Sequence, residues 1–275
     1  MHEDIETLVK MAHKPRITAK AFEKMNTYAC IVSSIIEQPT EVMGLLVGSA
    51  DDKTCTATDA YLIADQNVKG GEGVPDGNGV GAGYIWAKKQ GKKVVGMWHS
   101  HGSHGNFHSP DDDEHLEVLL IKNSYYLKNN LLINGLETPY ASSIVINEEG
   151  YQRPCPAHKP KKKEHYFCCV CIRDESGEKR IVDDLELEIV ESDDDILIDG
   201  FALAQEVCNK VKHEGMYLGY LVAVEEHKAP AVSVFGDTFL LFVKQWIADS
   251  WDSLKGCLSG KGSGENGNAE EKNVA

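Results

Sequence analysis

The sequence predicts an α/β fold, with helices on a central sheet, followed by a smaller α+β unit. Apolar residues at helical spacing behind a capping threonine predict a helix over Thr18–Glu37. Short apolar runs over Glu41–Val47, Val94–Trp98 and Ala141–Ile146 alternate with helical segments, which is typical of a sheet covered by helices. A Pro- and Lys-rich stretch over 154–163 then separates the two parts.

Four segments are expected along the 275 residues. Residues 1–153 would form the first domain, 154–163 a linker, 164–259 an α+β accessory domain of unassigned role, and 260–275 a disordered, low-complexity tail. Within the first domain, further helices are expected over Glu3–Ala12, Ala82–Gln90 and Pro110–Lys122.

The charge and hydropathy of the chain restrict its partners and its location. A formal net charge of -15 argues against nucleic acid or an anionic membrane as partner, because both favour basic surfaces. No apolar run approaches the roughly 18 residues that cross a bilayer, and the acidic start MHEDIETLVK lacks an apolar signal core. The simplest expectation is a cytoplasmic protein whose cysteines are thiols or metal ligands.

Histidines gather in VVGMWHSHGSHGNFHSPDDDEHL, residues 94–116, which holds five of the eleven in the chain. His99 and His101 are two residues apart at the end of a predicted strand, so their side chains point the same way. The Ser-Pro pair that follows predicts a helix start, with Ser109 as N-cap and Asp112 in the first turn. We therefore predict a metal site formed by His99, His101 and Asp112, with a fourth position for water as in catalytic zinc sites.

The spacing His-x-His, seven residues, Ser, two residues, Asp resembles the JAMM signature of the MPN-domain zinc metalloproteases. The resemblance covers roughly Lys14–Gly150, and Glu41 in EVMGLLVG matches the glutamate that the family places on an earlier strand. Gly102 is a departure, since many relatives have proline after the second histidine. The resemblance implies the MPN fold, a cytidine-deaminase-like α-β-α sandwich around a mixed sheet.

The resemblance also implies a zinc-dependent isopeptidase that hydrolyses the amide between the C-terminal glycine of ubiquitin, or of a ubiquitin-like protein, and a substrate lysine. Glu41 would be the general base that takes a proton from water and delivers it to the leaving amine. Ser109 has two interpretations: an N-cap worth about 1 kcal/mol, or an oxyanion donor, as the resemblance implies. The expected partners are ubiquitin or ubiquitin-like conjugates, and the second half of the chain is a candidate for binding substrate, docking to a larger protein assembly or mediating dimerisation.

Three alternatives accompany this hypothesis. A zinc hydrolase of a small peptide or a cysteine adduct would share the whole site. A non-catalytic MPN scaffold subunit would normally lack part of the motif, and no part is missing here. A zinc-dependent deaminase is disfavoured because its His-x-Glu and Pro-Cys-x-x-Cys signature is absent.

Other motifs have two interpretations each. The glycine-rich stretch over 68–83 predicts a mobile loop, either a flap over a bound substrate tail or a disordered connection. A second, structural zinc site would use Cys155, His158, Cys168 and Cys171. The apolar setting of the last two cysteines favours buried thiols instead. The remaining histidines of the cluster are expected in solvent or behind the ligands; these are His104, His108 and His115.

Overall fold

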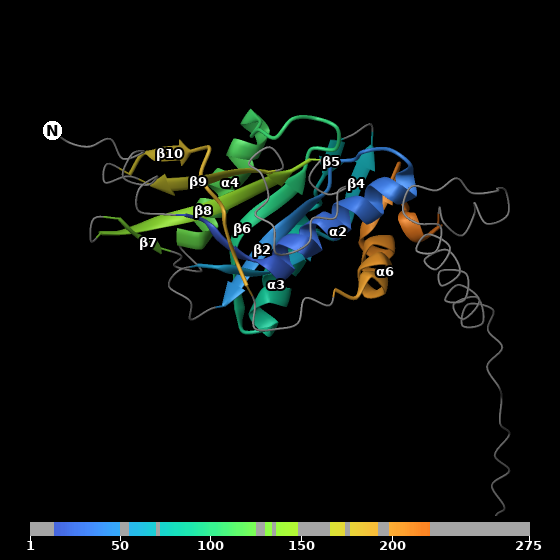
Figure 1. Cartoon of the computed structure of the whole chain (residues 1–275), viewed down its shortest axis with the longest axis horizontal. Helices are drawn as coiled ribbons and strands as arrows, with labels where there is room; N and C mark the ends of the chain where they lie inside the picture. The colour runs from blue at the N-terminus through green and yellow to red at the C-terminus, as the bar shows by residue number, and fades with distance from the viewer. Residues whose placement is uncertain are drawn as a thin grey trace, which may run out of the picture. The chain divides into compact units, whose positions relative to one another are not determined.

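The computed structural model describes residues 14–49, 55–69, 72–124, 130–133, 136–147, 166–173, 177–191 and 198–220 (Figure 1). The chain divides into two units, Met1–Leu221 and Val222–Ala275, and every described residue belongs to the first. The helix expected over 3–12, the linker over 154–163 and the tail over 260–275 lie outside the described residues. Within the described ranges, no helix is long and apolar enough to cross a membrane.

Two sheets and four helices make up the described part of the chain. The larger sheet has the order β10-β9-β8-β6-β2-β3-β1-β11, with β7 paired to β8, and the smaller one has the order β13-β12-β4-β5. The larger sheet contains β1 (Arg16–Thr18), β2 (Met43–Ser49), β3 (Ala57–Leu62), β6 (Lys92–Ser100), β7 (Asn130–Ile133), β8 (Leu136–Ile146), β9 (Tyr166–Arg173), β10 (Lys179–Val182) and β11 (Glu188–Val190). The smaller contains β4 (Gln66–Lys69), β5 (Glu72–Val74), β12 (Val211–His213) and β13 (Met216–Tyr217). The helices are α2 (Ala19–Ile36), α3 (Gly77–Lys89), α4 (Pro110–Lys122) and α6 (Gly200–Lys210).

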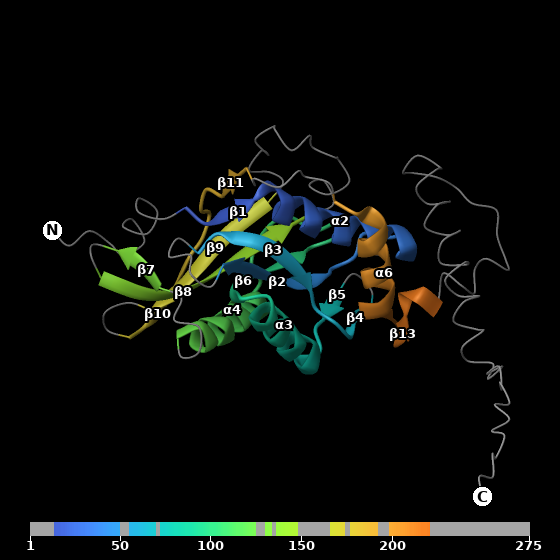
Figure 2. The same cartoon turned by 90° about the horizontal axis from the view of Figure 1, so that it is seen from below.

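The larger sheet lies between helical layers, with α2 on one face and α3 and α4 on the other (Figure 2). Strand alternation assigns the side chains to these faces. Trp98 of β6 stacks on Tyr28 of α2 at a ring-centroid distance of 6.1 Å, whereas Met97 packs in one buried cluster with Leu116 of α4. Because β6 pairs antiparallel with β2 and parallel with β8, the sheet is mixed. The expected α-β-α sandwich around a mixed sheet is confirmed.

Local sequence signals place two of the helices correctly. Thr18 caps α2 by accepting a hydrogen bond from the backbone N–H of Ala21 at 3.2 Å, close to the start expected at that residue. Helix α4 has the expected bounds, Pro110–Lys122. Strand β2 begins at Met43, two residues later than expected, so Glu41 lies just before the strand.

The described residues of the glycine-rich stretch, 68–69 and 72–83, lie mostly in regular structure, so the prediction of a loop there was wrong. Its first part forms the antiparallel hairpin β4–β5. Its second part belongs to α3, which begins five residues before the expected Ala82 because Asp76 caps the helix by accepting from the N–H groups of Asn78 and Gly79. The glycines of this stretch therefore do not keep it out of regular structure.

The prediction of an accessory domain from residue 164 is also wrong for the described residues. Strand β9 pairs antiparallel with β8 from Tyr166 opposite Ile146 to Ile172 opposite Tyr140. Strand β11 pairs with β1, and β12 pairs with β4. The apolar β9 continues the larger sheet beyond β8 and buries most of its side chains there. The segment 166–217 thus completes the two sheets of the first unit.

Helix α6 packs on α2. Tyr28 Oη donates a hydrogen bond to Glu206 of α6 at 2.5 Å. The short strand β13 ends at Tyr217, and residues 218–220 after it are helical.

A half-buried ion-pair cluster gives a test of this packing. The Asp59 carboxylate of β3 accepts from Lys24 Nζ at 2.8 Å and from Lys92 Nζ at 3.1 Å. Burial alone would raise the pKa of Asp59, but the two ammonium groups outweigh it and lower this pKa. The stabilisation is therefore present above the pKa of Asp in the unfolded chain, about 3.9, and is lost as the pH falls through the lower folded-state pKa.

We predict that Asp59→Asn lowers the free energy of unfolding at pH 7 by about 1–3 kcal/mol, because charge-assisted hydrogen bonds are lost. The difference from wild type should shrink below about pH 4. Urea unfolding across pH measures both effects. Glu186→Gln is the control, since it removes an exposed ion pair with Lys14 and should change stability little. A difference for Asp59→Asn that does not depend on pH would contradict the electrostatic explanation.

Candidate metal centre

The end of β6 is fixed by hydrogen bonds on both sides. Ser100 Oγ accepts from the N–H of Val42 at 3.0 Å and donates to the carbonyl oxygen of Thr40 at 2.9 Å. The N–H of His101 donates to the carbonyl oxygen of Ile146 in β8 at 2.8 Å. The backbone that carries His99 and His101 is thereby held between the segment before β2 and the end of β8.

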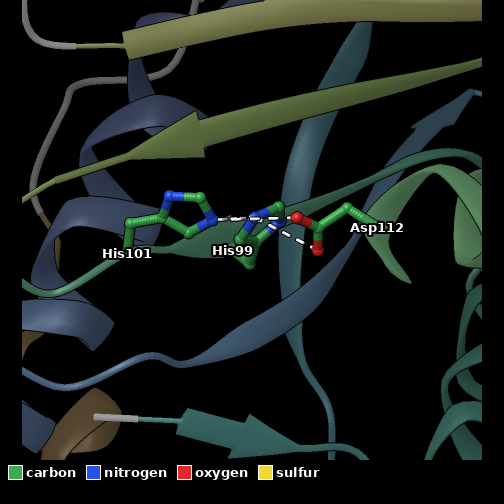
Figure 3. Close-up of side chains that lie close together, drawn as sticks. All are labelled: His99, His101 and Asp112. Carbon is green, nitrogen blue, oxygen red and sulfur yellow. Dashed lines mark hydrogen bonds and ion pairs between the residues drawn. The ribbon is translucent and has the colours of Figure 1, made fainter. Parts of the chain in front are cut away.

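Three side chains converge at this strand end, as Figure 3 shows. The two Nε2 atoms of His99 and His101 are 3.0 Å apart. Asp112 Oδ1 is 3.4 Å from His99 Nε2, and Asp112 Oδ2 is 3.7 Å from His101 Nε2. Tetrahedral ligands at about 2.0–2.1 Å from one zinc ion lie about 3.3 Å from one another. The spacing of the three groups therefore fits one shared metal ion.

Helix α4 begins with a capping box that orients Asp112. Ser109 Oγ accepts from the N–H of Asp112 at 3.2 Å. In return, Asp112 Oδ2 accepts from the N–H of Ser109 at 2.8 Å and from its Oγ–H at 2.6 Å. The N-cap interpretation of Ser109 is thus confirmed, and in this arrangement its hydroxyl proton points to Asp112. The oxyanion interpretation of Ser109 stays a prediction.

The charges and hydrogen bonds of these groups suit metal ligands, which must have free lone pairs. His101 Nδ1–H donates to the carbonyl oxygen of Gly105 at 2.9 Å, so in the neutral ring the lone pair is on Nε2 and faces the other two groups. Burial opposes protonation of His101, but hydrogen bonds to Asp112 and Gly105 outweigh it and raise its pKa, so metal binding would displace a proton here. Complete burial lowers the pKa of His99 and favours the neutral ring. Burial opposes ionisation of Asp112, but His101, His99 and Ser109 outweigh it and hold its pKa well below the usual range.

Gly102, the departure from the family pattern, has a positive φ of 55°. Proline is restricted to a φ near −65°, so it does not fit this backbone. A Cβ on Gly102 would also lie 3.0 Å from the backbone of Pro39. The loop after the second histidine is therefore built differently from one that contains proline, while both histidines keep their place.

Glu41 is half-buried and lies close enough to the triad to respond to its charges. Burial, reinforced by Asp112, raises the pKa of Glu41 to about 7, although His101 and a hydrogen bond from the N–H of Gly73 act in the opposite direction. A carboxyl group with this pKa can accept or donate a proton near neutral pH. In the strand after it, Met43, Leu45 and Val47 share one face and lie in one buried cluster with Leu116 of α4.

His108 makes buried contacts beside the triad that the sequence did not predict. Its side chain is only 4% exposed, and its Nδ1 is 2.6 Å from Asp113 Oδ1. Its Nε2 is 2.9 Å from Ser143 Oγ of β8, and its ring centroid lies 5.8 Å from that of His99. His108 thus connects the first turn of α4 to the sheet beside the triad. No local pattern reveals this link, because Ser143 is 35 residues further along the chain.

Two of the four ligands expected for a second zinc site are described, and they are not arranged as predicted. Cys168 and Cys171 are both buried in β9, and residues three apart in a strand point to opposite faces. Burial raises the pKa of Cys171 to about 12 and also raises that of Cys168, which disfavours the thiolates that zinc needs. The other two proposed ligands, Cys155 and His158, lie outside the described residues.

We predict that His108→Ala lowers the free energy of unfolding by about 1–3 kcal/mol, because the buried hydroxyl of Ser143 loses its partner. Thermal and urea unfolding measure this change. His104→Ala is the matched control, since His104 is exposed in the same loop and its loss should have no effect. Equal stability of the two variants would show that His108 does not tie α4 to β8.

The comparisons with known proteins agree with this geometry. Residues 31–146 match the family model of the prokaryotic homologues of the JAB domain, and this range contains Glu41 and the whole His-x-His to Asp112 motif. No curated protein matches the chain.

Two solved structures are similar to the chain. One is the solution structure of a protein from Desulfitobacterium hafniense, with 18% identity, coverage of 64% of this chain and 93% of that chain, and a TM-score of 0.38. The other is the crystal structure of a JAB1/MPN domain protein from Archaeoglobus fulgidus, with 17% identity, coverage of 64% and 99%, and a TM-score of 0.28. Residues 31–146 of this chain, with the whole motif inside them, are therefore the part that matches the JAB domain family.

Proposed function

We propose that this chain is a zinc-dependent isopeptidase. Its substrate would be the amide between the C-terminal glycine of ubiquitin, or of a ubiquitin-like protein, and a lysine side chain. The observation that supports this proposal is the buried triad of His99, His101 and Asp112 with Glu41 beside it, inside the segment that matches the JAB domain. A cytoplasmic location is part of the proposal.

Zinc is the proposed metal because two imidazoles and one carboxylate, with a fourth position open, are a common ligand set of catalytic zinc. When bound, zinc lowers the pKa of a coordinated water to about 7 and polarises the carbonyl group that is attacked. His99 and His101 would each contribute Nε2, and Asp112 a carboxylate oxygen. The hydrogen bond from His101 Nδ1 to Gly105 would keep that ring in the required orientation.

Glu41 is the proposed general base and acid. It would take a proton from the attacking water and then deliver it to the leaving lysine amine. Its raised pKa, about 7, supports both steps, because the carboxyl group can change protonation near neutral pH. The N–H of Gly73 would hold the ionised carboxylate in place between turnovers.

Ser109 is the proposed oxyanion donor. In the structure its hydroxyl proton is directed to Asp112 Oδ2, at 2.6 Å. If this hydroxyl rotated away, Asp112 would still accept the hydrogen bond from the backbone N–H of Ser109. Asp112 would then keep one of its two hydrogen bonds from Ser109. The freed O–H could then stabilise the negative oxygen of the tetrahedral intermediate.

An extended peptide tail is the substrate form that the surroundings favour. β5 is an edge strand of the smaller sheet among the described residues, and an edge strand can pair with an incoming extended chain. A cavity of about 250 Å³ lies between the larger sheet, α3 and α4, with Met43, Leu45, Met97, Val80 and Leu119 among its mostly apolar lining. This cavity would take an apolar side chain of the tail.

We predict that the zinc-loaded wild-type protein cleaves ubiquitin or ubiquitin-like conjugates, and that Glu41→Gln lowers the rate by at least about 10²-fold because the proton acceptor is lost. Gel assays with a panel of conjugates and a zinc determination test this. Both proteins should contain the same amount of zinc. Glu37→Gln is the control, because Glu37 is an exposed carboxylate at the C-cap of α2 and should be dispensable.

Three outcomes would overturn the proposal. Equal cleavage by wild type and Glu41→Gln would remove Glu41 from the mechanism. Cleavage of small amides or cysteine adducts, but of no protein conjugate, would instead support the small-substrate hydrolase. A zinc-loaded protein that cleaves neither class would support the scaffold.

A further inference from the structure

The hairpin beside Glu41 is completed by a segment that lies outside the JAB match. β4 and β5 fall within residues 31–146, whereas α6, β12 and β13 span Gly200–Tyr217. The smaller sheet has the order β13-β12-β4-β5, so the later segment supplies half of its strands. The two views agree that α6 and this sheet lie at the same end of the molecule (Figures 1 and 2).

Backbone pairing joins the two segments directly. β12 pairs parallel with β4, with Val211, Lys212 and His213 opposite Gln66, Asn67 and Val68. A hairpin of one four-residue and one three-residue strand is marginally stable by itself in water. The two added strands extend it to a four-stranded sheet before any substrate is bound.

Side chains reinforce this pairing. Lys212 Nζ is 2.7 Å from Asp65 Oδ1, and Tyr217 Oη also donates to Asp65. His213 Nδ1–H donates to the carbonyl oxygen of Val68 at 3.0 Å. The N–H of Gly215 donates to Asn67 Oδ1 at 3.0 Å. Contacts from β12, its turn and β13 therefore reach β4 and the residue just before it.

Helix α6 anchors this segment to the body of the domain. Lys210 Nζ donates to the carbonyl oxygen of Leu62 in β3 at 3.0 Å and to Glu206 at 2.6 Å. The same ammonium group lies 3.7 Å from the ring centroid of Tyr61. Since Glu206 also accepts from Tyr28 of α2, α6 is fixed to both the sheet and a helical layer.

On its other side, the hairpin contacts the residues that hold Glu41. The fully buried Gln66 accepts from the N–H of Met43 and donates to its carbonyl oxygen, both at 2.9 Å. Gly73 of β5 donates its N–H to the Glu41 carboxylate. A Cβ on Gly73 would lie 2.7 Å from the carbonyl oxygen of Glu41, so β5 packs directly on this backbone.

We propose that Gly200–Tyr217 is a positioning element of the hydrolytic site, which holds β4–β5 in register so that Gln66 and Gly73 fix the segment carrying Glu41. The inference rests on the proposed function for the role of Glu41 and extends the site to residues outside the JAB match. A hairpin ordered in advance also costs less entropy when an extended chain binds along β5.

The test compares the full-length wild-type protein with Lys212→Ala/Tyr217→Phe, which removes both side-chain contacts to Asp65. Amide hydrogen exchange should become at least about tenfold faster at Gly73 and in β4, with β6 and β8 unchanged, because opening of the hairpin becomes easier. In the conjugate assay, kcat/KM should fall by about tenfold. The single variant Lys212→Arg can keep the ion pair, so its hydrogen-exchange rate and its kcat/KM should stay at the wild-type values. Lys14→Ala is the control for loss of an exposed ion pair elsewhere in the protein.

Unchanged exchange at Gly73 would overturn the inference whatever the activity. Faster exchange with unchanged kcat/KM would also overturn it, since the segment would then stabilise the hairpin without positioning the site. Absence of cleavage by the wild-type protein would contradict the proposed function instead, and the exchange rate at Gly73 would then decide this inference by itself.

Discussion

A buried carboxylate is costly unless hydrogen bonds or opposite charges surround it, and the arrangement around Asp112 meets this constraint. Asp112 is only 5% exposed. Its oxygens face the two Nε2 atoms of His99 and His101, while the N–H and hydroxyl of Ser109 hold Oδ2 from behind. The capping box, the fixed end of β6 and the packing of α4 on the sheet all serve to keep these groups in contact.

The same groups could be predicted from sequence because their geometry is local. The His-x-His spacing needs only an extended strand end, and the Ser-Pro pair and Asp112 need only the first turn of a helix. The bounds of α4 and the convergence of the triad followed from these rules. The proposed role of Glu41 as general base came from the resemblance and not from local geometry, and the structure adds its burial and its contact with Gly73.

The features that sequence reasoning missed depend on long-range pairing. Glycine content indicated a loop over 68–83, yet β4 is stabilised by β12, and the bond from His213 to Val68 joins residues 145 positions apart. The Pro- and Lys-rich stretch over 154–163 indicated a domain boundary, yet β9 pairs with β8. His108 reaches a serine on a distant strand. Composition describes a segment and says nothing of the strand that will pair with it.

The chain thus combines a segment that matches the JAB domain with later segments that complete its sheets. β9, β10 and β11 extend the larger sheet at its two edges, whereas β12 and β13 extend the smaller sheet beside Glu41. The matched segment holds the three residues whose arrangement fits a metal ion, and the surrounding support comes partly from residues far outside it.

The proposed function requires that His99, His101 and Asp112 share one metal ion. A crystal structure of the zinc-soaked, full-length protein, with anomalous diffraction collected at the zinc absorption edge, tests this. One strong peak is expected at about 2.0–2.2 Å from both Nε2 atoms and from one Asp112 carboxylate oxygen. A peak bound by other residues, or no peak between these three side chains at saturating zinc, would contradict it.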